Sequence, residues 1–242
     1  MPDDSFGPIS VFDMLKIGVG PSSSHTLGLW RAAEHFVAGL RRAGQLDAVV
    51  RVQVVFAGSL AKTGRGHGTG IAAMMGLAGH DPETCDVGEV QRLGPDTLAT
   101  GQLRLGGTHS VPFVRERDID FDGGVTLSSH PNGMRLRATT VDGRVIEQVS
   151  YSIGGGFIVH DVAHDATSAP VSVDAVSLPC RVDSAADLLA WCGNDRIISD
   201  VVRANERVWR GDAEIDAGLL RLRDAMLDCA FRGVSTTGTL PG

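Results

Sequence analysis

The sequence of 242 residues lacks several features that would place it in a specialised class. It contains no apolar run near the ~20 residues that a transmembrane helix needs, so no membrane association is expected. Its 22 Lys and Arg are outnumbered by 29 Asp and Glu, the net charge is -7, and no basic patch stands out, which argues against a nucleic-acid partner. The acidic N-terminus lacks the form of a signal peptide, so we expect a cytoplasmic protein.

Cysteine is also scarce, with four residues spread over the chain. Cys85, Cys180, Cys192 and Cys229 show neither C-x-x-C spacing nor a disulfide framework. We therefore expect reduced thiols that pack as small apolar side chains, and no set of metal ligands. Glycine, by contrast, is abundant at 31 residues, well above its usual share of ~7%. The additional glycines gather in loops, where the backbone turns sharply or approaches a ligand.

A loop of small residues, GVGPSSSHT at 18–26, opens onto a predicted helix that begins near Ser24. Gly44 is the stop signal of this helix, whose apolar stripe consists of Leu29, Ala33, Phe36, Val37 and Leu40. Free backbone N–H groups and the positive end of the helix dipole meet at the loop, which favours a carboxylate or phosphate. A single N-cap serine would explain only one or two of the loop's polar residues. The candidate binding residues are Ser22, Ser23, Ser24, His25 and Thr26.

A second glycine-rich loop lies between a predicted strand and a predicted helix. Residues 48–56 are β-branched and almost all apolar, which is typical of a buried strand. Residues 57–70 are expected to form a loop, and residues 71–77 predict a compact buried helix that ends at Gly79. The order of strand, glycine loop and helix is common at ligand sites of α/β proteins.

The middle of the chain has a different pattern. Residues 80–110 are expected to be irregular, because the dipeptides Asp81-Pro82 and Gly94-Pro95 interrupt regular secondary structure. Asp142 and Gly143 give a two-residue hairpin signal between two of the strands that follow. The predicted β segments are 112–120, 134–141, 144–151 and 157–160.

The composition changes again near residue 164. Residues 164–182 include a stretch rich in Ala, Ser, Val and Pro and are predicted to be a linker. Amphipathic helices follow in 183–242, and we expect this helical segment to be the interrupted start of a larger helical domain. We therefore predict an α/β domain at 1–163, with a mixed sheet and packed helices, followed by the linker and a short all-helical segment.

Three histidines lie in polar or glycine-rich turns: His25, His67 and His130. An imidazole among glycines has little side-chain packing around it, so His67 is the main candidate for a general base. For His130, an ordinary role in the turn before Asn132 competes with a catalytic one. A zinc site is a weaker interpretation, because these three residues match no compact ligand spacing. A dinucleotide fingerprint also fails, because Thr69 occupies its third glycine position.

Several motifs, in order along nearly the whole chain, resemble the bacterial iron–sulfur L-serine dehydratases. They are SVFDMLKIGVGPSSSHT at 10–26, GHGT at 66–69, HPNGM at 130–134, YSIGGGFIV at 151–159, NE at 205–206 and TGTLPG at 237–242. That family has a β portion and an α portion, and the α portion carries the cysteine ligands of a [4Fe–4S] cluster. This chain resembles the β portion with the first helices of the α portion, so the cluster ligands are expected outside it.

The resemblance implies an L-serine ammonia-lyase of serine catabolism and gluconeogenesis, which converts L-serine to pyruvate and ammonia without pyridoxal phosphate. His67 would remove the α-proton, and His130 with Asn132 would orient the substrate or the base. The loop 22–26 would hold the substrate carboxylate, and Gly66, Gly68 and Thr69 would complete the substrate site. A homo-oligomer is expected, and the chain alone is expected to be inactive without the α portion.

The resemblance also supports an alternative function. The β portion is similar to the allosteric substrate-binding domain of some 3-phosphoglycerate dehydrogenases, where such a cradle holds an anion without catalysis. A non-catalytic, anion-binding regulatory module is therefore the rival hypothesis. In the family, Asp-Lys usually follows the Gly-Thr step, whereas Gly70 and Ile71 follow it here, so a charge pair is missing beside His67. Threonine is an alternative substrate, and the α portion can lie on the same chain or on another.

Overall fold

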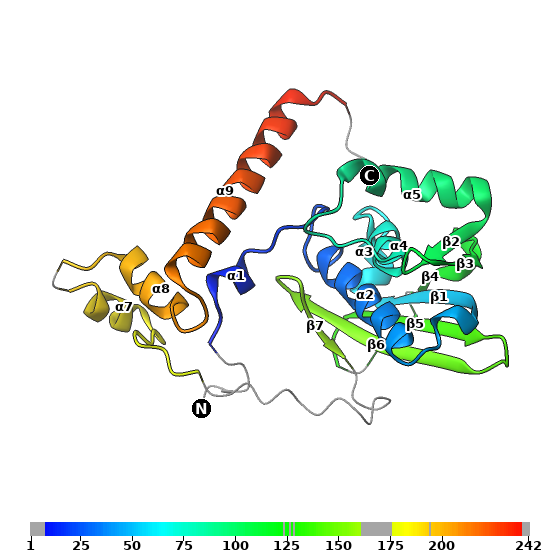
Figure 1. Ribbon diagram of the computed structural model, residues 1–242, viewed down its shortest axis with the longest axis horizontal. Coiled ribbons are helices and arrows are strands. Elements are labelled where there is room, and N and C mark those ends of the chain that lie inside the picture. The colour runs from blue at the N-terminus through cyan, green and yellow to red at the C-terminus, as the bar shows by residue number, and fades with distance from the viewer. Residues whose placement is uncertain are drawn as a thin grey trace. The chain divides into compact units, whose positions relative to one another are not determined.

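The computed structural model describes residues 8–122, 124–125, 127, 129–160, 176–193 and 195–238. They divide into an α/β unit, drawn from 18–160, and a helical unit, drawn from 8–17 and 176–238 (Figure 1). None of the helices in these ranges has both the length and the apolar character that a membrane span requires.

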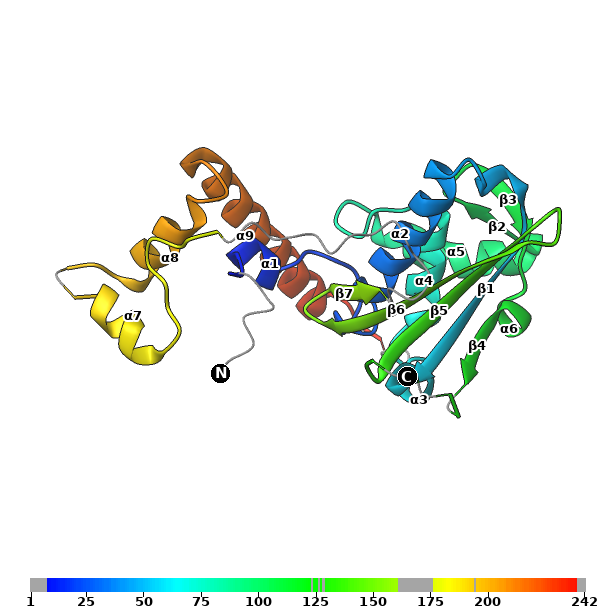
Figure 2. The same ribbon diagram turned by 90° about the horizontal axis from the view of Figure 1, so that it is seen from below.

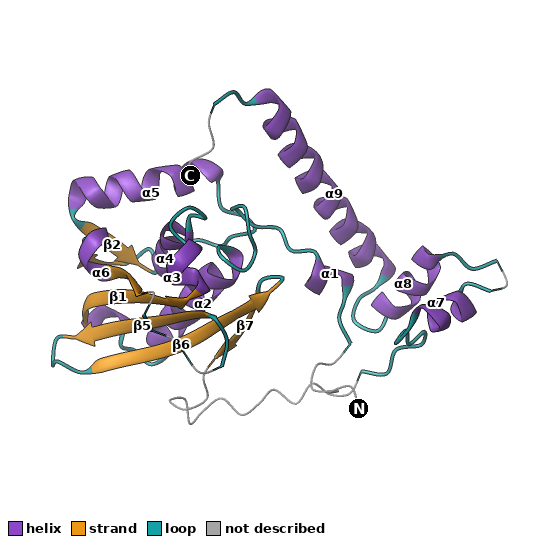
Figure 3. Ribbon diagram, turned by 180° about the vertical axis from the view of Figure 1, so that it is seen from behind, coloured by secondary structure: helices purple, strands orange, loops and turns teal. Residues whose placement is uncertain are grey.

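A mixed five-stranded sheet forms the base of the α/β unit, which confirms the predicted fold class (Figure 3). Its strand order is β4-β1-β5-β6-β7, with β4 parallel to β1 and the other neighbours antiparallel. A separate two-stranded sheet pairs β2 with β3. The strands are β1 (Val49–Gly58), β2 (Gln102–Leu105), β3 (His109–Pro112), β4 (Ile119–Asp122), β5 (Asn132–Thr140), β6 (Val145–Gly154) and β7 (Phe157–His160).

Two helices, α2 (Leu27–Arg42) and α4 (Thr69–Ala78), lie on one face of this sheet (Figure 2). The predicted apolar stripe of α2 is buried in the core, together with Met74 and Leu77 of α4. Strand residues two apart point to the same face, so β1 and β5 bury alternate side chains against these helices. Those strand residues are Val52, Val54, Phe56, Met134, Leu136 and Ala138.

The opposite face of the sheet carries charged side chains. Glu147 on β6 accepts contacts from Arg135 and Arg137 on β5, at 3.2 and 2.5 Å. An antiparallel region with one core face and one polar face needs helices on one side only. The hairpin predicted at Asp142 and Gly143 is present, with Gly143 at φ +83°.

The expectation of irregular structure over 80–110 is wrong. Asp86 is the N-cap of helix α5 (Val87–Thr100), and its side chain accepts the Gly88 N–H at 2.6 Å. Pro95 lies inside this helix. Tertiary packing outweighs the cost of the proline, because Val90 and Leu93 pack against the cluster of Trp30, Ala72 and Met75.

Two further segments differ from the prediction. The expected strand at 112–120 ends early and is followed by α6 (Arg115–Asp118) and β4. The buried Asp118 carboxylate closes this turn by accepting the Val114 N–H at 2.9 Å, and it also accepts Arg51 Nε at 3.1 Å. The expected loop at 57–70 contains a short helix, α3 (Ser59–Thr63), and η1 (Leu46–Ala48) precedes β1.

The helical unit contains α1 (Val11–Met14), α7 (Ala185–Trp191), α8 (Ile198–Glu206) and α9 (Asp212–Ser235). The Glu206 carboxylate, 3% exposed, accepts the Ser10 hydroxyl at 2.9 Å and the Val11 N–H at 2.6 Å. Asn205 exchanges two hydrogen bonds with the backbone of Cys180. The structure therefore groups residues 8–17, placed in the α/β domain by the sequence, with these helices. Most of the predicted linker, through residue 175, lies outside the described residues.

The contact between α2 and α4 leaves no room for a side chain at Gly76. A Cβ there would overlap the Trp30 carbonyl oxygen and lie 2.7 Å from the Ala33 Cβ. We expect Gly76→Ala to lower the free energy of unfolding by about 1–3 kcal/mol, because the two helices must separate. Urea denaturation followed by circular dichroism measures this change.

Gly39→Ala in α2 is the matched control, since a Cβ at Gly39 meets nothing within 4 Å. Its expected effect is neutral or stabilising by up to about 1 kcal/mol, from helix propensity alone. Equal stability of the two variants would contradict the close approach of the helices.

Candidate functional site

A cavity of about 530 Å³ lies at the N-terminal ends of α2 and α4. It is mainly apolar and includes four of the predicted site residues: Thr26, Gly66, His67 and Gly68. Its lining residues are Val19, Gly20, Pro21, Thr26, Trp30, Gly66, His67, Gly68, Ile71, Ala72 and Val90. A second cavity of about 330 Å³ shares Gly66, Gly68, Ile71 and Val90 with it, and its lining also includes Arg65 and Arg115.

Glycines at two positions shape the turn that carries His67. Gly58, at the end of β1, has φ +59° and packs so closely on the Pro131 carbonyl group that a Cβ would overlap it. Gly68 has φ +72° and is the N-cap of α4. Only glycine adopts such a conformation without strain. The chain therefore leaves β1, forms α3 and turns at 64–68 directly into α4, with His67 beside the cavity.

Two of the three candidate histidines meet at this site. The ring centroids of His25 and His67 are 4.7 Å apart, with an interplanar angle of 32°. His25 Nε2 lies 2.8 Å from the Thr63 hydroxyl, and His67 Nδ1 lies 2.8 Å from the Thr63 carbonyl oxygen. Thr63, the last residue of α3, thus contacts both rings. Sequence reasoning missed it, because nothing in the local pattern distinguishes it from any other exposed threonine.

Burial is the main cause that lowers the pKa of His25, and the charge of neighbouring His67 lowers it further. A neutral His25 is consistent with its ring contacts, since Nδ1 lies 3.1 Å from the Ser24 hydroxyl and 3.4 Å from the Ser22 hydroxyl. The lowered pKa therefore favours the neutral form of His25 beside His67.

The serine-rich loop satisfies much of its own hydrogen-bonding capacity. Helix α2 begins at Leu27 and not near Ser24, and the N–H groups of His25 and Thr26 donate to the Ser22 carbonyl oxygen. The Gly28 N–H donates to the Ser23 carbonyl oxygen, and the Thr26 hydroxyl donates to the Ser22 carbonyl oxygen. A carboxylate bound at this loop would have to exchange with some of these internal bonds.

His130 belongs to a separate group of contacts. Its Nδ1 accepts the Asn132 N–H at 3.1 Å, and Asn132 Nδ2 donates to the Ser152 carbonyl oxygen at 3.2 Å. Ser152 packs against Gly28 in the first turn of α2, and its buried hydroxyl has no hydrogen-bond partner among the described residues. The described contacts join none of these residues to His67. Ser152 is a further polar residue near the loop that the sequence did not single out.

Thr69, the remaining predicted residue, is fully buried at the start of α4. Its hydroxyl also lacks a hydrogen-bond partner among the residues described. The hydroxyl is close to Gly64, where an added Cβ would lie 2.8 Å from it. Thr69 therefore packs beneath the turn that carries His67, and its side chain is not on the cavity wall.

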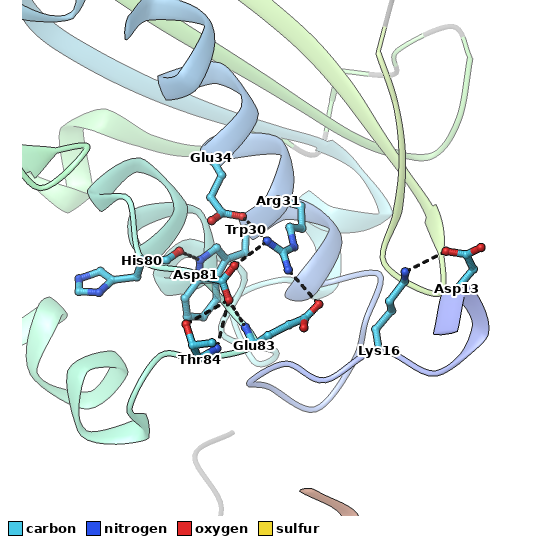
Figure 4. A network of polar contacts seen from close by, with 9 residues as sticks. All are labelled: Asp13, Lys16, Trp30, Arg31, Glu34, His80, Asp81, Glu83 and Thr84. Carbon is cyan, nitrogen blue, oxygen red and sulfur yellow. Dashed lines mark hydrogen bonds and ion pairs between the residues drawn. The ribbon is translucent and has the colours of Figure 1, made fainter. Parts of the chain in front are cut away.

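A polar network fixes the Trp30 wall of the cavity (Figure 4). The Trp30 indole N–H donates to the His80 carbonyl oxygen at 2.6 Å. The next residue, Arg31, forms ion pairs with Glu34 at 3.1 Å and with Asp81 at 3.0 Å, and it also pairs with Glu83. The network thus ties the first turns of α2 to the loop after α4.

The described residues contain no group of three or more His, Cys, Asp or Glu side chains arranged to hold a metal ion. The four cysteines are free thiols: Cys180 is buried, Cys85 and Cys192 are half-buried, and Cys229 is exposed.

Comparisons with known proteins agree on one family. A model of the serine dehydratase beta chain matches residues 10–163. An L-serine dehydratase of Mycobacterium tuberculosis (strain CDC 1551 / Oshkosh) is 44% identical over 240 residues, covering 97% of this chain and 50% of the relative. L-serine dehydratase 1 of Escherichia coli (strain K12) is 42% identical over 236 residues, with 97% and 51% covered. The chain thus spans about half the length of these relatives.

The lowered pKa of His25 predicts a pH-dependent stability. The folded chain binds a proton at His25 less readily than the unfolded chain does. The free energy of unfolding is therefore not reduced by His25 above the unfolded pKa near 6.5, and it decreases as the pH falls below that value. We expect the wild type to lose more thermal stability than His25→Gln between pH 8 and pH 5. Differential scanning calorimetry of both proteins measures this, and parallel pH profiles would contradict it.

Proposed function

Because the chain belongs to the serine dehydratase beta chain family, we propose that it forms part of the active site of an iron–sulfur L-serine dehydratase. The complete enzyme would convert L-serine to pyruvate and ammonia, in the cytoplasm and as a homo-oligomer. The similarity to curated L-serine dehydratases over 97% of the chain supports serine over threonine as the substrate.

The observation that carries the proposal is the hydrogen bond between His67 Nδ1 and the Thr63 carbonyl oxygen, at 2.8 Å. A carbonyl oxygen only accepts, so Nδ1 must carry the hydrogen. In the neutral ring, Nε2 then has a free lone pair. A neutral imidazole on the wall of a cavity is suited to act as a general base. We propose that His67 Nε2 removes the α-proton of serine.

The remaining predicted residues would bind and orient the substrate. Gly66 and Gly68 lie on the cavity wall without side chains, so their backbone can approach a small amino acid closely. The loop 22–26 would hold the carboxylate after exchanging internal hydrogen bonds. His130 and Asn132 would orient the substrate or the base. Thr69 would support the turn from below.

The residues of this chain do not fit the [4Fe–4S] cluster that the resemblance implies. Such clusters are held by cysteine thiolates, and the described residues offer no group of three or more potential ligands. Cys85 lies in the α/β unit, whereas Cys180, Cys192 and Cys229 lie in the helical unit. We therefore propose that the α portion supplies the cluster ligands.

The helical unit supports an α portion as the partner. Helix α9 exposes large apolar side chains along its length: Leu220 is 49% exposed, Leu227 61% and Phe231 71%. Their spacing of seven and four residues places them on one side of the helix. An apolar helix face of this size is expected to be covered, and we propose that the α portion covers it.

One observation favours the non-catalytic alternative. Arg65 and Arg115 line the smaller cavity beside His67, and guanidinium groups suit carboxylates and phosphates. If the chain is a regulatory module, an anion would bind there and no residue of this chain would take part in proton transfer.

Substitution of His67 separates the two functions. In the complete enzyme, His67→Ala should lower kcat by about 10²–10⁴-fold, as expected for loss of a general base. The KM for serine should change much less, because the carboxylate is held elsewhere, and the iron content should stay normal. His80→Ala is the control, since the structural hydrogen bond of His80 uses its backbone carbonyl group. Near-normal turnover of His67→Ala would favour the regulatory module.

A second experiment tests the division of labour between the two portions. After anaerobic reconstitution with iron and sulfide, this chain alone should bind no [4Fe–4S] cluster and produce no pyruvate from serine. Addition of the α portion should restore both. Reconstitution giving ~four irons per chain, with pyruvate formation, would contradict the proposal.

A further inference from the structure

We infer that Thr63 is a positioning residue that fixes the tautomers of both imidazoles, His25 through its hydroxyl group and His67 through its carbonyl oxygen. The inference deepens the proposed function, because it assigns Thr63 the task of holding the base. The directions of the hydrogen bonds around the two rings determine both tautomers.

The direction of the bond to His25 follows from the hydroxyl of Thr63. This hydroxyl lies 2.9 Å from the Ser59 carbonyl oxygen, one turn earlier in α3. A carbonyl oxygen only accepts, so the single hydroxyl hydrogen of Thr63 is donated to Ser59. The contact of 2.8 Å between the same hydroxyl oxygen and His25 Nε2 must then be a donation from Nε2–H. Neutral His25 is therefore the Nε2–H tautomer.

The other nitrogen of His25 must then accept. The Ser24 hydroxyl lies 3.1 Å from Nδ1 and donates to it, and the Ser22 hydroxyl lies 3.2 Å from that of Ser24. Each group in this chain thus donates to the next, in the order Ser22, Ser24, His25, Thr63 and Ser59. Bonds in such a chain polarise and strengthen one another. Both ring nitrogens of His25 are engaged in this chain of hydrogen bonds, so His25 is held in one orientation beside the site.

The same threonine controls the second ring. Its carbonyl oxygen takes the Nδ1–H of His67 at 2.8 Å, and the two rings are 4.7 Å apart. A base must lie within hydrogen-bond reach of its proton, and small displacements of catalytic groups cost large factors in rate. Release of His25 from Thr63 would remove the packing partner of His67 on one side.

Thr63→Val tests the role of the hydroxyl with little change in shape, and Thr63→Ser restores the hydroxyl. The backbone carbonyl group remains in both variants. Imidazole ¹⁵N chemical shifts of this chain at pH 8 distinguish an N–H nitrogen from an unprotonated one. We expect Nε2–H for His25 and Nδ1–H for His67 in the wild type and in Thr63→Ser. In Thr63→Val, His25 should become a mixture of tautomers.

Thr100→Val is a matched control. The Thr100 hydroxyl also lies in the last turn of a helix and donates to the carbonyl oxygen four residues earlier, at 2.8 Å. Unlike Thr63, it has no histidine beside it in the described contacts. In the complete enzyme, Thr63→Val should lower kcat by about ten- to a hundredfold with KM nearly unchanged, whereas Thr63→Ser and Thr100→Val should remain close to wild type.

The outcomes separate this inference from the proposed function. An unchanged His25 tautomer in Thr63→Val, or a Thr63→Ser variant as slow as Thr63→Val, would overturn the role of Thr63. Normal turnover of His67→Ala would overturn the base while leaving the ¹⁵N assignment of the tautomers intact. If the Nδ1 of His67 proves unprotonated in the wild type, the positioning role fails whatever the activity.

Discussion

The close packing of α2 on α4 is the contact on which the α/β unit depends. At Gly76 the two helices approach so closely that a methyl group would overlap the backbone of α2. Residues from the first turns of both helices consequently line the same cavity. His25 and His67 each lie two residues before the first residue of their helix, at Leu27 and Thr69. The helix contact therefore brings together two imidazoles that are 42 residues apart in the sequence.

The packing of α2 on α4 also affects the electrostatics of the site. The N-terminal ends of two helices carry partial positive charge, and burial further disfavours an additional positive charge nearby. Burial and the charge of His67 lower the pKa of His25, which matches this setting. Neutral imidazoles with defined tautomers are the form in which one ring can be held by hydrogen bonds while the other presents a lone pair. Thr63 contacts both rings and so links the orientation of one to that of the other.

One motif shared with the family has a structural role in this chain. Asn205 and Glu206, part of the resemblance to the family, form structural bonds within the helical unit. The buried Glu206 carboxylate is compensated by the Ser10 hydroxyl, the Val11 N–H and Arg210, whose Nη1 lies 3.4 Å away. A buried charge without such partners would be strongly destabilising. These two residues hold together segments that are distant in sequence.

Local periodicity alone determined much of the fold. The stripe of α2, the β-branched run of β1 and the Asp142-Gly143 hairpin each follow from short-range patterns, because side-chain spacing and turn geometry are local properties. Helix α5 was missed because its proline is tolerated only through packing of Val90 and Leu93. The strand expected at 112–120 was interrupted because the buried Asp118 closes a turn.

The site divides in the same way between sequence and tertiary structure. The sequence by itself proposed His25, His67, His130 and the two small-residue loops as candidates, since histidines and glycines in turns have a distinctive composition. Only the tertiary structure decided that His25 contacts His67, that His130 lies with Asn132 and Ser152, and that Thr63 joins the two rings. The physical reason is that hydrogen-bond partners and their directions depend on distances between segments, which no local pattern encodes.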